Sequence, residues 1–297
     1  MRASRDTAAG RAYLDLQAKA KMEGQPTAAL LTLYALEGFL ARLAASGHSD
    51  KLVLKGGVLL AAFLVRRPTR DVDLQAQAVP NDTDSVLDLV RGIAAGTPVG
   101  GDDGLVFDAE DAKAEVIRDE DAYSGVRVSL KATLHTARIT FHVDVNVGDP
   151  IWPAPEQVAL PRLLGGSVAL RGYPMPMVHA EKLVTAIARG TANTRWRDFG
   201  DVYVLSGTHA VTAVDLHAAM TTVAAHRQVQ LQPLKDVLEG YELIAQTKYA
   251  AWRRKHSRDE LPEQFADLLD AVIAFADPVL TDGATGGTWQ PARRGWQ

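Results

Sequence analysis

The stretch that decides the fold is KLVLKGGVLLAAFLVRRPTRDVDL, residues 51–74. Its first part, Leu52–Leu54, is a short apolar run that predicts a buried strand, and Gly56 and Gly57 interrupt it. The continuously apolar segment Val58–Val65 then predicts a short helix, which a proline ends. A strand, a glycine pair and a helix start therefore follow one another without a spacer.

Two carboxylates open the next predicted strand. Asp71 and Asp73 alternate with Val72 and Leu74, and the period of two in a strand places both acids on one face. Mg²⁺ prefers hard oxygen ligands and takes one or two protein carboxylates together with water and substrate phosphates. Asp71 and Asp73 are therefore the candidate metal ligands.

The glycine pair completes the layout that nucleotidyl transfer requires. Gly56 and Gly57 carry no Cβ, so backbone N–H groups at a helix start can approach phosphate oxygens. A P-loop is excluded because no G-x-x-x-x-G-K-[ST] pattern follows Gly56. Taken singly, a glycine pair can be an ordinary turn and a D-x-D pattern a solvated strand face.

These residues carry a resemblance to a known family. The run YALEGFLARLAASGHSDKLVLKGGVLLAAF from Tyr34, followed by PTRDVDLQ, resembles the AbiEii/AbiGii-type nucleotidyltransferase toxins, which include the MenT toxins. They belong to the DNA polymerase β-like nucleotidyltransferase superfamily. Their first motif is matched by Gly56, Gly57, Asp71 and Asp73. Thr69, in the same segment, is a further catalytic candidate.

A second part of the chain resembles the later motifs of the family. The run HAEKLVTAIARGTANTRWRDFGDVYVL matches K-[LI]-x-x-[AL]-x-x-R and [KR]-D-x-x-D-[LIV]-Y. The resemblance implies that Lys182 contacts the nucleotide phosphates and that Asp198 is a later catalytic acid, a role that Asp201 could also fill. Lys182 and Arg189 are two helical turns apart and could share a face lining a cleft opposite the aspartates. Asp198 and Asp201 lie three apart on one helix face, and from spacing alone the alternative is an ordinary salt-bridged face in which Arg197 pairs with a neighbouring acid.

One more acid lies on a predicted central strand. Asp144 stands between Val143 and Val145, where a carboxylate costs free energy unless it is paired or bound to a metal. The resemblance implies a third acid on a neighbouring strand, acting as general base or second-metal ligand. Asp144 is the candidate, and an outward-facing strand residue is the alternative. Asp149, before Pro150, is interpreted as a turn residue.

The composition limits the possible classes of protein. The chain has 297 residues, of which 47% are hydrophobic, and a net charge of −4, which gives no overall attraction to nucleic acid. It has no cysteine, so disulfides, cysteine zinc sites and thiol nucleophiles are excluded. No signal peptide or apolar run of membrane-spanning length is recognised, and we expect a cytoplasmic protein without a membrane partner.

The predicted elements indicate an α+β fold in two lobes. We expect a nucleotidyltransferase lobe over residues 1–150, with a mixed sheet and helices, and a mainly helical lobe over residues 151–297. The proline-rich segment 151–161 is interpreted as a linker. The sequence predicts strands over 105–107, 114–117, 126–134 and 139–147, and helices over 178–188, 196–205, 214–225, 233–244, 249–256 and 262–275. The glycines of 283–295 predict a loose tail.

A local cluster of cations could contact RNA. Arg253, Arg254 and Lys255 lie near Tyr249 and Trp252, and such a patch could neutralise backbone phosphates. Its alternative is a solvated helix end whose cations face the helix dipole.

The sequence thus favours an Mg²⁺-dependent (or Mn²⁺-dependent) nucleotidyltransferase. The resemblance implies a toxin of a toxin–antitoxin system that adds nucleotides from NTP to RNA, with the tRNA 3′ acceptor end as the expected acceptor. Such a toxin blocks growth and has a cognate antitoxin protein. A role in phage defence belongs to the same family expectation. The alternatives are a small-molecule nucleotidyltransferase of the aminoglycoside-modifying kind and a catalytically silent binding module.

Overall fold

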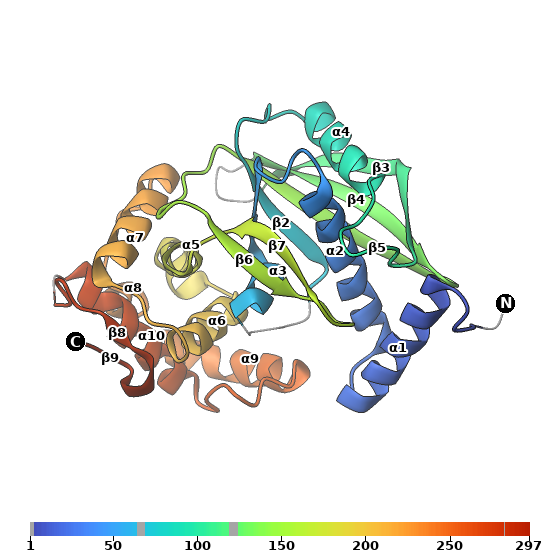
Figure 1. Cartoon of the computed structure of the whole chain (residues 1–297). Coiled ribbons are helices and arrows are strands. Elements are labelled where there is room, and N and C mark those ends of the chain that lie inside the picture. Colours follow the sequence, from blue (N-terminus) through green and yellow to red (C-terminus); the bar gives the residue numbers. More distant parts are fainter. Residues whose placement is uncertain (1–2, 64–68, 119–123, 282) are drawn as a thin grey trace. The chain divides into compact units, whose positions relative to one another are not determined.

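The computed structural model describes residues 3–63, 69–118, 124–281 and 283–297 (Figure 1). The chain divides into two compact units. Unit 1 comprises Met1–Asp149 and Pro155–Tyr173, and unit 2 comprises Pro150–Ala154 and Pro174–Gln297. Unit 1 is a mixed sheet with helices and unit 2 is mainly helical, as the predicted α+β class requires.

Unit 1 contains four α-helices and seven strands among its described residues. The helices are α1 (Ala8–Glu23), α2 (Thr27–Ala45), α3 (Gly56–Leu59) and α4 (Thr83–Ala94), and a short 3₁₀ helix, Leu60–Phe63, continues α3. The strands are β1 (Leu52–Lys55), β2 (Asp71–Ala76), β3 (Leu105–Arg118), β4 (Ser124–Leu134), β5 (Ala137–Val147), β6 (Glu156–Pro161) and β7 (Ser167–Gly172).

The strands form one sheet in the order β3-β4-β5-β2-β1-β7-β6. The short strands β1 and β2 pair antiparallel near its centre, and β2 runs parallel to β5. The strand that carries the D-x-D pattern is therefore flanked on both sides, by β1 before it in sequence and by β5 well after it.

Helix α2 is the core helix of unit 1. Its Phe39 ring contacts Phe141 of β5 edge-on, with ring centroids 6.2 Å apart. Helix α2 is long and apolar enough to cross a membrane, which the sequence analysis did not recognise. However, 67% of its most apolar 18-residue segment is buried inside the structure. Its two buried charges have partners: Glu37 accepts from the Leu163 N–H, and Arg42 pairs with Asp103 at 2.7 Å. Such burial is that of a core helix.

Several predicted elements of unit 1 are corrected by the sheet. The expected strands 105–107 and 114–117 are one strand, β3, with an irregularity in its pairing between Asp108 and Lys113. The expected linker 151–161 is wrong in its second half, because β6 pairs with β7 and β7 pairs with β1. Residues 155–173 therefore belong to unit 1. Val65 and Pro68, at the expected end of the helix that follows the glycine pair, lie outside the described residues.

Unit 2 is built mainly from helices. They are α5 (Met175–Arg189), α6 (Trp196–Ser206), α7 (Ala213–Arg227), α8 (Leu234–Val237), α9 (Tyr241–Lys255) and α10 (Phe265–Leu280), with a 3₁₀ helix at Gly190–Ala192. The helix expected over 233–244 is interrupted, because Gly240 has φ +74° and α9 begins after it. The helix expected over 249–256 is the second half of α9.

The C-terminal segment is packed, whereas its glycines had predicted a loose tail. Strands β8 (Trp289–Gln290) and β9 (Gly295–Trp296) pair antiparallel around a 3₁₀ turn, Pro291–Arg293. Trp289 is fully buried, and its indole N–H donates to the Ser206 carbonyl at 2.7 Å. Trp289 and Trp296, which lie near Gly295, give this segment enough apolar surface to pack against the rest of unit 2.

Candidate active site

A row of four charged residues crosses the sheet of unit 1. Strand pairing places Arg127 (β4) opposite Asp144 (β5), Asp144 beside Asp73 (β2), and Asp73 opposite Lys55 (β1). Directly paired residues of neighbouring strands project from the same face of a sheet. The row therefore carries the charges plus, minus, minus, plus in sequence across four strands.

A second row of polar side chains lies two residues away along the same strands. Asp71 pairs in register with His142, and His142 pairs with Ser129, whose hydroxyl lies 3.0 Å from the His142 Nδ1. Asp71 and Asp73 are both half-buried, whereas Val72 and Leu74 between them are fully buried. The alternation predicted from sequence is confirmed, and the two acids share one face of β2.

The opposite face of the same strands is apolar. Phe141, Val143 and Val145 of β5 are completely buried, and Phe141 meets α2 through Phe39. Because α2 covers that face, the polar side chains that alternate with these residues project from the other one. The fold thus separates a core face from a charged face within single strands.

Gly56 is required by its conformation and by its neighbour. Its φ is +67°, a left-handed value that favours glycine, and a Cβ there would lie 1.9 Å from Asp73 Oδ2. The backbone N–H of Gly57 points at the same oxygen from 3.4 Å. Here Gly56 makes room for the Asp73 carboxylate, a reason that the sequence did not show.

Burial, together with the nearby carboxylates of Asp144 and Asp71, raises the pKa of Asp73 to about 6. Lys55 and the Gly57 N–H act in the opposite direction. Two like charges beside a third in a site of low polarity are unfavourable unless a cation joins them. The cluster is therefore electrostatically suited to a divalent ion.

Asp144 lies beside Asp73 as predicted, but it already has a partner. Arg127 Nε and Nη2 donate to its two oxygens at 2.8 and 2.7 Å, a bidentate ion pair, and the pKa of Arg127 is raised by this bonding. For Asp144 to act as base or second-metal ligand, this pair must open. Its assignment to either role stays a prediction. Arg127 was missed because no sequence motif marks it.

Lys55 is the second residue that the sequence analysis missed. It is only 8% exposed, and its Nζ lies 3.3 Å from Asp149 Oδ2 and 5.7 Å from the centre of the Tyr173 ring. The amide of buried Gln75, oriented so that its nitrogen faces the carboxylate, donates to Asp149 at 3.0 Å. Asp149 is therefore an ion-pair partner as well as a residue near a turn. A lysine closing an apolar strand just before two glycines was the available signal.

The residues present fit Mg²⁺. Asp71 and Asp73 would supply two carboxylate ligands, and Mg²⁺ commonly takes the rest of its shell from water and phosphate oxygens. Within the described part of the chain, no group of three or more His, Cys, Asp or Glu side chains could hold a metal ion. Asp71 and Asp73 would therefore leave most of the coordination shell of the ion to water and to the triphosphate.

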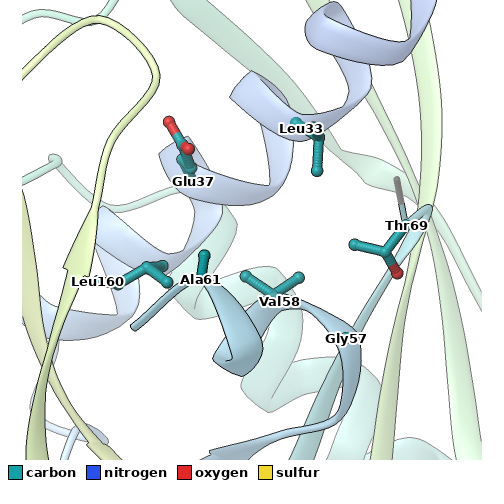
Figure 2. A pocket seen from close by; sticks show the side chains of 7 residues that line it. All are labelled: Leu33, Glu37, Gly57, Val58, Ala61, Thr69 and Leu160. Atoms are coloured by element: carbon teal, nitrogen blue, oxygen red, sulfur yellow. The ribbon is translucent and has the colours of Figure 1, made fainter. Parts of the chain in front are cut away.

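A small pocket lies beside the glycine pair (Figure 2). Leu33 and Glu37 of α2, Val58 and Ala61 near α3, and Thr69 and Leu160 surround it together with Gly57. Only about 10 Å³ is open to the centre of a water molecule, which is room for about one water. It is too small for a nucleotide, and it leaves Thr69 at its wall, where the Thr69 hydroxyl lies 3.4 Å from the Asp71 carbonyl.

The residues of the later motifs form a buried ion cluster in unit 2. Lys182 of α5 lies 3.1 Å from Asp198 Oδ1 and 2.9 Å from Asp201 Oδ2, both on α6. Arg195 completes the cluster at 2.6 Å from Asp198. Burial would raise the pKa of Asp198, but Lys182 and Arg195 hold it well below its usual range. The shared helix face of Asp198 and Asp201 is confirmed, and Arg195 supplies the pairing that sequence analysis had considered for Arg197.

The remaining predicted site residues lie in unit 2. Arg189 is the last residue of α5 and is half-buried. The prediction that Lys182 and Arg189 face Asp71 and Asp73 stays a prediction.

The cations of α9 differ from one another. Arg253 donates to the Leu261 and Asp259 carbonyls, so it holds the following loop, whereas Arg254 and Lys255 are exposed. Two of the three candidate RNA-binding cations therefore face solvent.

Comparison with known proteins identifies a family for this chain. Residues 38–271 match the family described as nucleotidyl transferase AbiEii toxin, Type IV TA system. A crystal structure of a provisionally assigned nucleotidyltransferase from H. pylori aligns with a TM-score of 0.50 and 16% identity, covering 86% of this chain and 96% of that one. The structure of JHP933 from Helicobacter pylori aligns with a TM-score of 0.41 and 15% identity, covering 78% and 97%. No curated protein matches the chain.

The family match defines the class of protein as a nucleotidyltransferase. The family match covers most of the chain, so the chain belongs to the AbiEii family and is a nucleotidyltransferase toxin of a toxin–antitoxin system.

Proposed function

We propose that this toxin transfers nucleoside monophosphates from an NTP to RNA, with the 3′ acceptor end of tRNA as the acceptor. The observation that carries the proposal is the placement of Asp71 and Asp73 on one face of β2, with Gly56 against Asp73. The choice of tRNA follows from the family resemblance of the sequence. Modification of that end would block translation and growth in the cytoplasm, and a cognate antitoxin would relieve the block.

The reaction joins an RNA hydroxyl oxygen to the α-phosphorus of the NTP. The bond from that phosphorus to the oxygen bridging the α- and β-phosphates breaks, pyrophosphate leaves with the bond electrons, and the hydroxyl proton passes to a base or to water. Asp71 and Asp73 would hold Mg²⁺, which supplies positive charge to the triphosphate when bound. The residues of unit 1 contribute a half-buried, preorganised site in which such charge stabilisation is strong.

The test is direct labelling. The purified chain is incubated with total RNA and each α-labelled NTP in turn, and we expect label in RNA of tRNA size together with release of pyrophosphate. Asp71→Ala and Asp73→Ala should each abolish labelling while folding normally, because either leaves the ion with one carboxylate. Asp88→Ala, which removes an exposed acid of α4, is the matched control.

Other outcomes contradict the proposal in separate ways. Label that enters aminoglycosides but not RNA would identify a small-molecule nucleotidyltransferase. No labelling with any NTP or acceptor would indicate a silent binding module. Retained activity in folded Asp71→Ala or Asp73→Ala would remove the metal assignment.

A further inference from the structure

Lys55 places a buried positive charge at one end of the charged row. It ends β1, immediately before Gly56, and its register partner across the strand pair is Asp73. Lysine is seldom buried without a partner because its ammonium loses hydration. At 8% exposure, Lys55 is held in the site by specific contacts.

Those contacts fix the ammonium from behind. Asp149 lies 3.3 Å from Nζ, and Gln75 and the backbone hold Asp149 in turn. The Gln75 oxygen accepts from the N–H groups of Gly148 and Asp149 at 3.1 and 2.8 Å. Gln75 and Asp73 alternate on the same face of β2, so this network belongs to the same surface as the metal ligands.

The charge of Lys55 has opposite effects on two ligands. A fixed cation close to Asp73 repels a bare divalent ion, whereas it attracts the same ion when it arrives with a triphosphate of net negative charge. Lys55 also directly precedes the glycine pair at which phosphates are expected. A lysine in this position would therefore favour the metal–triphosphate complex over the free metal ion.

We propose that Lys55, fixed by Asp149 and Gln75, is a phosphate-selecting residue of the nucleotidyl-transfer site. This inference rests on the proposed function, because it takes an NTP as the ligand. It assigns the positive charge for the triphosphate to unit 1 itself, in addition to the family-implied Lys182.

The test measures binding without turnover. Full-length protein is titrated calorimetrically with MnCl₂ alone and with the Mg²⁺ complexes of the α,β-methylene analogues of the four NTPs. Lys55→Met keeps the length of the side chain and removes its charge. We expect it to bind the preferred analogue at least about tenfold more weakly and to bind Mn²⁺ alone as tightly as the wild type or more tightly.

Three variants sharpen the result. Lys51→Met removes an exposed lysine just before β1 and should leave both affinities unchanged. Lys55→Arg keeps the charge and should recover part of the analogue affinity. Asp149→Asn should weaken analogue binding less than Lys55→Met, and adding it to Lys55→Met should have no further effect, because Asp149 acts through Lys55.

The outcomes that overturn the proposal are distinct. Wild-type analogue affinity in Lys55→Met would refute the role of Lys55 and leave the proposed function standing. Equal losses for Mn²⁺ and the analogue would show a structural role only. A wild-type protein that binds none of the four analogues would overturn the proposed function and this inference with it.

Discussion

Asp73 is the residue at which the charges of the site converge. It lies beside Asp144, opposite Lys55 and against Gly56, and burial is the main reason that its pKa is raised to about 6. A carboxyl group whose pKa is higher in the folded than in the unfolded chain makes folding less favourable as it ionises. The raised pKa of Asp73 should therefore make the free energy of unfolding of the metal-free protein depend on pH.

We predict that Asp73→Asn stabilises the metal-free protein at pH 8 and not near pH 4. Below the ordinary value of 3.8 the carboxyl is protonated in both states, and between 3.8 and about 6 stability falls as pH rises, because the folded state binds more protons. Above about pH 6 the carboxyl is ionised in both states, and its burial lowers the free energy of unfolding by up to about 3 kcal/mol. Urea denaturation in EDTA at both pH values measures it. A difference from wild type that is equal at the two pH values would contradict the burial of this charge.

Gly56→Ala should displace the Asp73 carboxylate. The added Cβ would meet Asp73 Oδ2 at 1.9 Å, and the positive φ adds backbone strain of about 1 kcal/mol or more. Transfer should fall about a hundredfold or more, because a catalytic ligand moves by about an ångström. Gly47→Ala, where nothing lies within 4 Å of the added Cβ, is the control. Equal rates in the two variants would show that the Gly56 contact has no effect on catalysis.

At the scale of elements, the ion cluster around Lys182 connects α5 to α6. Asp198 and Asp201 are 6% and 0% exposed, and their carboxylates share the Lys182 ammonium. The sequence alone gave Lys182 no structural role, since a lysine on an amphipathic helix is usually solvated. In the fold, its removal leaves buried carboxylates with less compensation.

Lys182→Ala should therefore lose both stability and activity. We expect a loss of about 3 kcal/mol in unfolding free energy and, from its family-implied contact with phosphates, a rate about thirty- to a thousandfold lower. Lys182→Arg should be partly active. Lys248→Ala, on the exposed side of α9, should change stability by a few tenths of a kcal/mol only. A wild-type transfer rate in folded Lys182→Ala, assayed well below its melting temperature, would refute the phosphate role.

The C-terminal hairpin is a structural element of unit 2. Trp289 contacts Phe275 edge-on with ring centroids 4.9 Å apart, and Trp296 stacks on the same ring. Trp289→Ala should destabilise the protein by about 3–5 kcal/mol, the range for a buried aromatic replaced by alanine. Leu243→Ala, at a side chain 82% exposed, should be nearly neutral in the same thermal unfolding measurement. Similar melting temperatures in the two variants would mean that the hairpin does not contribute to the core.

At the scale of the whole molecule, the net charge of −4 provides no general attraction to RNA. The salt dependence of RNA binding should then report a few local cations. Arg254 and Lys255 are exposed, and replacing both with alanine should reduce the slope of log K against log salt by about 1.5–2. Filter binding at salt concentrations from about 50 to about 200 mM measures this slope. An unchanged slope would exclude α9 as an RNA surface.

The sequence by itself determined the local features of the protein. The alternation of Asp71 and Asp73 with apolar residues fixed their shared face, and the spacing of Asp198 and Asp201 fixed theirs, because strand and helix periodicities depend on neighbouring residues only. The family motifs gave the class of enzyme and its toxin character, which the family match confirmed. The glycine pair was also recognised, although not the reason for Gly56.

Only the tertiary structure decided which charges meet. Asp149 pairs with Lys55 across 94 positions of sequence, and Arg127 takes both oxygens of Asp144, as the register of the sheet dictates. The pairing of β7 with β1 and of β6 with β7 also draws β6 into unit 1, over residues where composition had suggested a linker. Contacts between distant segments depend on strand order, pairing and packing, which no local periodicity encodes, so the partners of Lys55 and Asp144 could be seen only in the fold.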